Sequence, residues 1–112
     1  MKFEKQIEQL NAEMQKYYGC DLQNGKELNE RLQKIGGLLY YLTTVRAYFH
    51  NLYETHLKEL VDSGTSVSAA QNACNVKYPE MYRLRRLLED AQRIHTALQV
   101  HISWLKAEMR NV

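Results

Sequence analysis

The sequence predicts an all-α fold: a long antiparallel helical hairpin with a short tip helix and an N-terminal helix packed at the base. Apolar residues recur at alternating steps of four and three, the spacing of a helix packed lengthwise against another helix. Only one proline and five glycines interrupt the 112 residues, which favours long helices over a many-turned β fold. We expect one domain, residues 1–112, and we expect such a hairpin to dimerise into a bundle.

The first helix is predicted to run from about residue 2 to residue 18, where Gly19 provides a natural end. Its apolar stripe consists of Phe3, Ile7, Leu10, Met14 and Tyr17. An Asn24-Gly25 pair closes the segment that follows, so we expect a turn-bearing loop before the next helix.

The second helix is predicted over about residues 26–62 and is the longest element. One face carries Leu28, Leu32, Ile35, Leu39, Leu42, Phe49 and His56. Gly36 and Gly37 lie inside it, where two glycines cost roughly 2 kcal/mol relative to alanine. They indicate either a kink or a place where another element approaches the backbone closely.

The third and fourth helices are predicted over about residues 67–77 and 79–110. Gly64 suits the residue after a helix end, and Thr65 and Ser66 can cap the next helix. Pro79 suits a first helical turn. The last helix carries an uninterrupted seam of Leu84, Leu88, Ala91, His95, Leu98, Ile102, Leu105 and Met109.

The two long helices should fold back on each other near residue 64, because the segment between them is short. If Asp62 lies near Pro79, the numbers of facing residues sum to about 141. This register places Arg46 opposite His95 and Gly37 opposite Trp104. It also predicts ion pairs between the acids Glu54, Glu59 and Asp62 and the arginines Arg83, Arg85 and Arg86.

Trp104 lies on the side of the last helix away from the main seam, beside Ala97, Val100 and Ala107. The C-terminal half of this helix therefore has a second apolar stripe that something must cover. We expect the first helix to fold back and cover it. The alternative is that the first helix projects away and the stripe is a dimer contact.

The composition and the motifs favour no enzymatic chemistry. The histidines lack the Glu-x-x-His or His-x-x-x-His spacing of metal sites in helical bundles, so we expect neither a metal nor a cofactor. Cys74 suits a buried apolar position and Cys20 a loop, and no base stands beside the serines. We therefore predict no catalytic residue and no small-molecule substrate.

The charge and the cysteine content limit which partners and which cellular compartment we expect for the chain. A formal net charge of +2 is too small to indicate a nucleic-acid or membrane partner. No apolar run resembles a signal peptide or a membrane span, and the two cysteines lie far apart. We expect a cytoplasmic protein with reduced thiols.

Tyrosines and arginines supply the candidate binding residues. Adjacent tyrosines on a helix point about 100° apart, so some of the eight tyrosines must lie at edges, where they are typical of interfaces. The interface candidates are Tyr40, Tyr41, Val100 and Trp104. A basic, tyrosine-containing group is the candidate nucleic-acid site, although interspersed acids favour ion pairs instead. It consists of Lys77, Tyr78, Tyr82, Arg83, Arg85, Arg86 and Arg93.

The stretch Gly-Thr-Ser-Val-Ser-Ala-Ala-Gln-Asn-Ala, the following tyrosine, the arginine-rich helix and the ending Ile-Ser-Trp-Leu-Lys resemble small helical proteins of tailed bacteriophages and integrated mobile elements. The resemblance spans about residues 38–109, excludes the first helix and transfers no functional residue. It implies a phage accessory protein. The leading hypothesis is a non-enzymatic interaction or assembly protein that binds itself or another protein. The alternative is a nucleic-acid-binding accessory protein that uses Arg83, Arg85 and Arg86.

Overall fold

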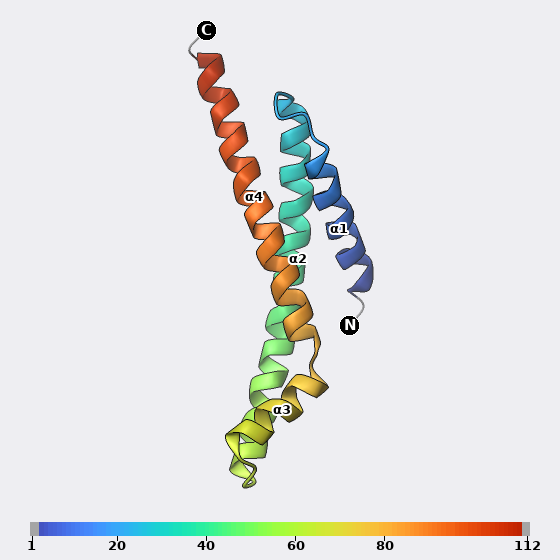
Figure 1. Cartoon of the computed structure of the whole chain (residues 1–112), viewed down its shortest axis with the longest axis vertical. Coiled ribbons are helices and arrows are strands. Elements are labelled where there is room, and N and C mark those ends of the chain that lie inside the picture. The colour runs from blue at the N-terminus through green and yellow to red at the C-terminus, as the bar shows by residue number, and fades with distance from the viewer. Residues whose placement is uncertain (1–2, 111–112) are drawn as a thin grey trace.

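The chain folds into four helices in the predicted order: α1 (Glu4–Tyr18), α2 (Gly25–Asp62), α3 (Val67–Lys77) and α4 (Glu80–Arg110). The computed structural model describes residues 3–110. It measures 68 × 26 × 17 Å, with α2 and α4 side by side and opposite in direction (Figure 1). The all-α hairpin is confirmed, whereas the predicted helix start at residue 2 lies outside the described residues.

The helix ends follow local capping chemistry. The Asn24 side chain accepts a hydrogen bond from the Glu27 amide at 3.1 Å, and Ser66 accepts one from the Ala69 amide at 3.3 Å. Gly64 ends α2 with a φ of 100°, a conformation that favours glycine. The Pro79 carbonyl accepts from the Arg83 amide at 3.3 Å, so Pro79 precedes the first turn of α4 rather than lying in it.

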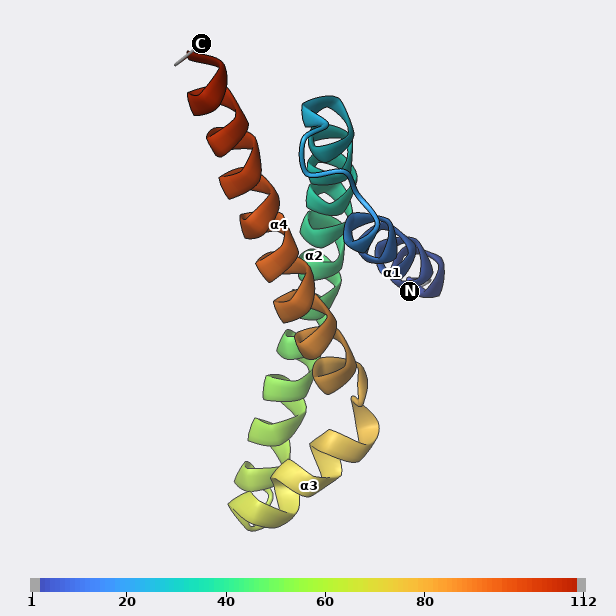
Figure 2. The same cartoon turned by 45° about the horizontal axis from the view of Figure 1, so that its top comes forward.

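The core lies where α1, α2 and α4 meet. Leu10, Ile35 and Leu84, one from each helix, are fully buried. Four residues of the predicted α4 seam are buried, namely Leu84, Leu88, Ala91 and Leu98. His95, Ile102 and Leu105 are half-buried, and Met109 is exposed and lies outside the core. The seam fails there because α4 diverges from α2 toward its C-terminus (Figure 2). None of the described helices has the length and apolar content that crossing a membrane requires.

The predicted register of the hairpin is wrong. A methyl group at Gly25 would lie 3.8 Å from Leu105 Cδ1, and one at Gly36 would lie 3.1 Å from His95 Nε2. The numbers of these facing residues sum to about 131, which is about ten residues, or roughly 15 Å, from the predicted register. Arg46 therefore does not face His95, and Gly37 does not face Trp104.

The register differs because α3 runs back along α2 instead of only covering the tip. Cys74 Sγ lies 3.7 Å from the Tyr53 carbonyl oxygen, and the Tyr53 hydroxyl donates to Asn75 Oδ1 at 2.9 Å. Because α3 packs against the last turns of α2, α4 cannot pack there and begins beside about residue 50 of α2. The predicted ion pairs between the acids at the end of α2 and the arginines of α4 consequently do not form. Glu59 lies instead in a hollow with Lys77 and Tyr78.

The two central glycines of α2 differ in their surroundings. The His95 ring approaches Gly36 closely, whereas nothing lies within 4 Å of a methyl group placed at Gly37. We expect Gly37→Ala to raise the free energy of unfolding by about 1 kcal/mol, the difference in helix propensity. Gly36→Ala should stabilise less, because His95 must move. Chemical denaturation of both variants checks this, and a destabilised Gly37→Ala protein would contradict it.

Candidate functional site

The side of α4 that faces away from α2 carries eight exposed residues at alternating steps of four and three. We call them the outer face of α4: Tyr82, Arg86, Glu89, Arg93, Thr96, Val100, Ser103 and Ala107. Three of the first four residues carry a charge, so we call these four the charged half. The last four are small, uncharged side chains that expose mainly carbon, and we call them the apolar half. This spacing is that of a second helix-packing seam, and it lies entirely at the surface.

The apolar half is uncovered in the described structure. Trp104 borders it and is 66% exposed, and Val100 is 56% exposed. The expectation that the first helix covers Trp104 is wrong, because α1 lies on the opposite side of α2 from this half of α4 (Figures 1 and 2). The alternative in which α1 projects away is wrong too, since Leu10 is fully buried.

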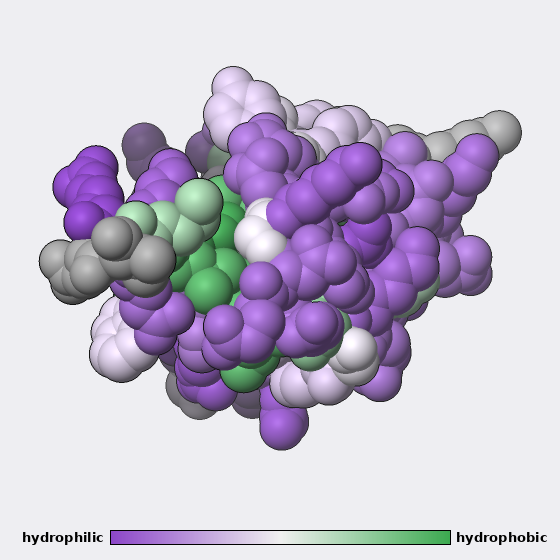
Figure 3. Space-filling view, turned by 90° about the horizontal axis from the view of Figure 1, so that it is seen from above, coloured by the Kyte–Doolittle hydropathy of each residue, from purple (hydrophilic) through white to green (hydrophobic). Residues whose placement is uncertain are grey.

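The exposed apolar surface continues onto the loop between α1 and α2. Leu22 and Gln23 line a hollow together with Val100, Trp104 and Leu105. Seen along the long axis, apolar side chains gather at this end of the molecule, close to the C-terminal end of α4 (Figure 3). The surface therefore joins two segments that are distant in sequence.

Both ion-paired side chains of the charged half have partners on neighbouring positions of α4. Arg85, beside the outer face, pairs with Glu89 at 3.2 Å. Arg93 pairs with Asp90 at 3.6 Å. Among the residues that the structure describes, Arg86 makes no ion pair. These contacts favour the interpretation of the arginines as ion pairs on a solvated surface.

Arg83 lies away from this surface and reaches α1. Its guanidinium donates two hydrogen bonds to the Glu4 carboxylate, at 2.6 and 2.7 Å. These bonds lower the pKa of Glu4, so the pair is charged at neutral pH. Arg83 thus joins the start of α4 to the start of α1.

The remaining predicted site residues are dispersed. Lys77 and Tyr78 lie in the hollow between α2 and α3, with the Lys77 ammonium 5.7 Å from the centre of the Tyr78 ring. Tyr40 and Tyr41 are exposed on α2. They lie roughly 22 Å along α2 from Gly25. Gly25 is packed beside Leu105, the neighbour of Trp104 on α4. The structure therefore brings Val100 and Trp104 together but keeps the two tyrosines apart from them.

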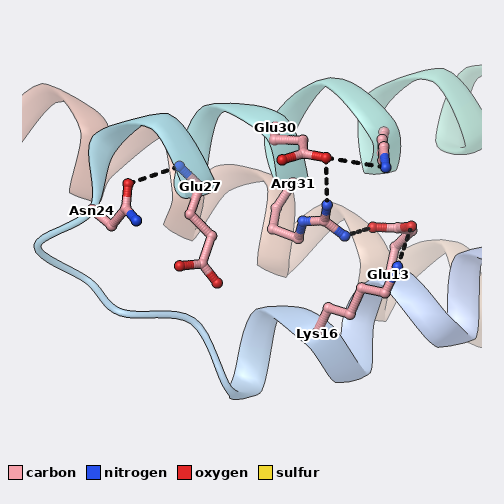
Figure 4. A network of polar contacts seen from close by, with 7 residues as sticks. Glu13, Lys16, Asn24, Glu27, Glu30 and Arg31 are labelled. Atoms are coloured by element: carbon pink, nitrogen blue, oxygen red, sulfur yellow. Dashed lines mark hydrogen bonds and ion pairs between the residues drawn. The ribbon is translucent and has the colours of Figure 1, made fainter.

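Sequence reasoning missed a buried ion pair between Arg31 and Glu13. Arg31 is 6% exposed and Glu13 is 8% exposed, and Glu30 also pairs with Arg31, at 3.2 Å (Figure 4). A signal was available, because both residues stand nine positions from Leu22 in the loop that joins α1 to α2. Opposite charges equidistant from a turn face each other in an antiparallel helix pair.

Burial raises the pKa of both Cys20 and Cys74, which disfavours the reactive thiolate. Within residues 3–110, no three His, Cys, Asp or Glu residues gather closely enough to hold a metal ion. Because Trp104 and Val100 are exposed beside a helix-packing seam, the apolar surface around Trp104 is the strongest candidate site. Comparisons with protein-family models, with characterised proteins and with solved structures gave no match.

Proposed function

We propose that the chain is a non-enzymatic assembly protein that self-associates through the apolar half of the outer face of α4. The observation that carries the proposal is the exposure of Trp104 and Val100 on a seam with helix-packing spacing. A cytoplasmic location and the role of a phage accessory protein belong to the same proposal, and the unpaired thiols of Cys20 and Cys74 suit a reducing compartment.

The division of the outer face into halves favours a second copy of the chain as the partner. A two-fold contact places the same surface on both sides. If two α4 helices cross antiparallel midway between Val100 and Ser103, their apolar halves meet over roughly 17 Å and their charged halves extend beyond the contact. Ser103 and Ala107 are small, so they allow the helices to approach closely. A parallel pairing would instead bring the arginines of both copies together.

Tryptophan fluorescence combined with light scattering tests the proposal, because Trp104 is the only tryptophan in the chain. With rising protein concentration, we expect the molar mass to reach that of a dimer and the emission to shift to the blue as Trp104 leaves water. Val100→Glu keeps the fluorescent probe. It should weaken dimerisation by more than about a hundredfold, because like charges at an interface cost several kcal/mol.

The matched control is Val76→Glu, at an exposed position on α3, which should dimerise like the wild type. A wild-type protein that stays monomeric with unchanged emission would contradict the proposal. So would equal dimerisation of the wild type and Val100→Glu. The nucleic-acid alternative would gain support if duplex DNA bound at micromolar protein with a steep salt dependence that Arg86→Ala reduces.

A further inference from the structure

A small cavity of about 130 Å³ lies where α2, α3 and α4 meet. Two arginines on facing helices contribute to it, and none of the described residues that line it is acidic. The lining residues are Arg46, Tyr53, Asn75, Met81, Tyr82 and Arg85. Arg46 from α2 and Arg85 from α4 thus line one space, and no carboxylate of the described residues lines it.

The hydrogen-bonding groups around this cavity are mostly donors. Arg46 Nε is buried and has no hydrogen-bond partner among the described residues. Arg85 uses its Nε on Glu89, which leaves both terminal amino groups of the guanidinium free for other acceptors. Asn75 accepts from Tyr53 through Oδ1, so its amide nitrogen still has protons to donate. The acceptors that line the cavity are the neutral oxygens of Tyr53, Tyr82 and Asn75, so none of them carries a charge to match the two arginines.

An unpaired buried donor on a charged group is costly, and an anion in the cavity would remove that cost. We propose that this cavity binds the phosphate group of a small ligand. Guanidinium groups favour phosphate because their planar donors match its oxygens, and the tetrahedral oxygens can accept from several directions at once. Arg46 would bind from α2 and Arg85 from α4.

The size and the opening of the cavity limit what can enter. Pockets for drug-sized ligands hold roughly 300–1,000 Å³, so this cavity has room for one small group only. Tyr82 is 58% exposed and the Arg85 side chain is 62% exposed, which leaves the α4 side open to solvent. Free phosphate fits whole, and a phosphate monoester can direct its ester group outward. The inference does not depend on self-association through the apolar half of α4.

Calorimetric titration of the full chain with inorganic phosphate, at constant ionic strength adjusted with chloride, tests the proposal. We expect saturable binding by the wild type. Arg46→Met and Arg85→Met should each lose at least tenfold in affinity. Arg86→Met is the matched control, since Arg86 is exposed on the same helix and does not line the cavity. Its affinity should equal that of the wild type.

A second measurement follows the Arg46 side chain directly. In ¹H–¹⁵N spectra, the Arg46 Nε–H resonance should move and exchange more slowly with water when phosphate is added, whereas that of Arg86 should not. This readout needs no substitution at Arg46, so it remains decisive if Arg46→Met fails to fold. Titration with glycerol phosphate separates the two sources of the group: binding identifies a phosphate ester as a ligand, and its absence restricts the site to the free ion.

Three outcomes would overturn the inference. The first is an equal response to phosphate and to chloride, which would indicate charge screening only. The second is an equal loss of affinity in Arg86→Met and Arg46→Met, which would place the effect on the outer surface. The third is tighter binding of acetate than of phosphate, which would assign the cavity to a carboxylate.

Discussion

Replacement of Arg31 by methionine is expected to lower the free energy of unfolding by about 3–5 kcal/mol. The substitution leaves the Glu13 carboxylate buried against α2 without its guanidinium partner, and only Lys16, at 3.4 Å, still pairs with it. Removing one member of a buried ion pair costs more than the pair itself contributes, because the remaining charge stays desolvated. Chemical denaturation of the wild type and the variant measures the difference.

A double substitution separates the ion pair from packing. Glu13→Leu combined with Arg31→Leu removes both charges and should recover most of the stability that Arg31→Met loses. Glu30→Gln serves as the matched control, because its side chain is 53% exposed and should matter little. If Arg31→Met cost less than about 1 kcal/mol, the pair would be a solvated contact and this account would be wrong.

Truncation of Leu10 to alanine is the second large effect that we expect, at about 2–5 kcal/mol. Leu10 is fully buried on α1, between the aromatic contact of Phe3 with Phe49 and the ion pair of Glu13. The loss combines the transfer free energy of the removed methyl groups with the cavity left between α1 and α2. Thermal or denaturant unfolding gives its size.

Hydrogen exchange shows which part of the molecule Leu10→Ala weakens. Amides of α1 should exchange faster in the variant, while those at the centre of the hairpin, near Leu98, should change less. Leu28→Ala, at an equally buried position on α2, should instead weaken both long helices. Uniform acceleration across α1, α2 and α4 in Leu10→Ala would show that α1 does not dock as a separate unit.

The helices themselves could be predicted because their signals are local. The four-three spacing of apolar residues, Ser66 as a cap and Gly64 as an end depend only on neighbours in the chain. The bounds of α3 and the last residues of α1, α2 and α4 agree with the prediction, while α2 begins one residue earlier and α4 one residue later than predicted. The antiparallel hairpin also followed, because a short connection between long helices leaves few other arrangements.

The pairing of helices could not be predicted in the same way. A seven-residue repeat looks nearly the same after a shift of one repeat, so the spacing on α4 fits several registers against α2. The contact of Tyr53 with Asn75 selects one of them, and it depends on how α3 packs. Whether Trp104 is buried or exposed depended on where α1 packs, and the apolar stripe of α1 does not specify that position.

The sequence by itself determined the four helices, their order and the reversal near Gly64, since capping, backbone preference and hydrophobic spacing act over a few residues. Only the tertiary structure decided which side chains lie together. Arg31 pairs with Glu13, Arg83 pairs with Glu4, and Arg46 and Arg85 line one cavity. Each of these contacts joins residues that are far apart in the chain. They are set by the competition among all the apolar faces for burial, which no single segment contains.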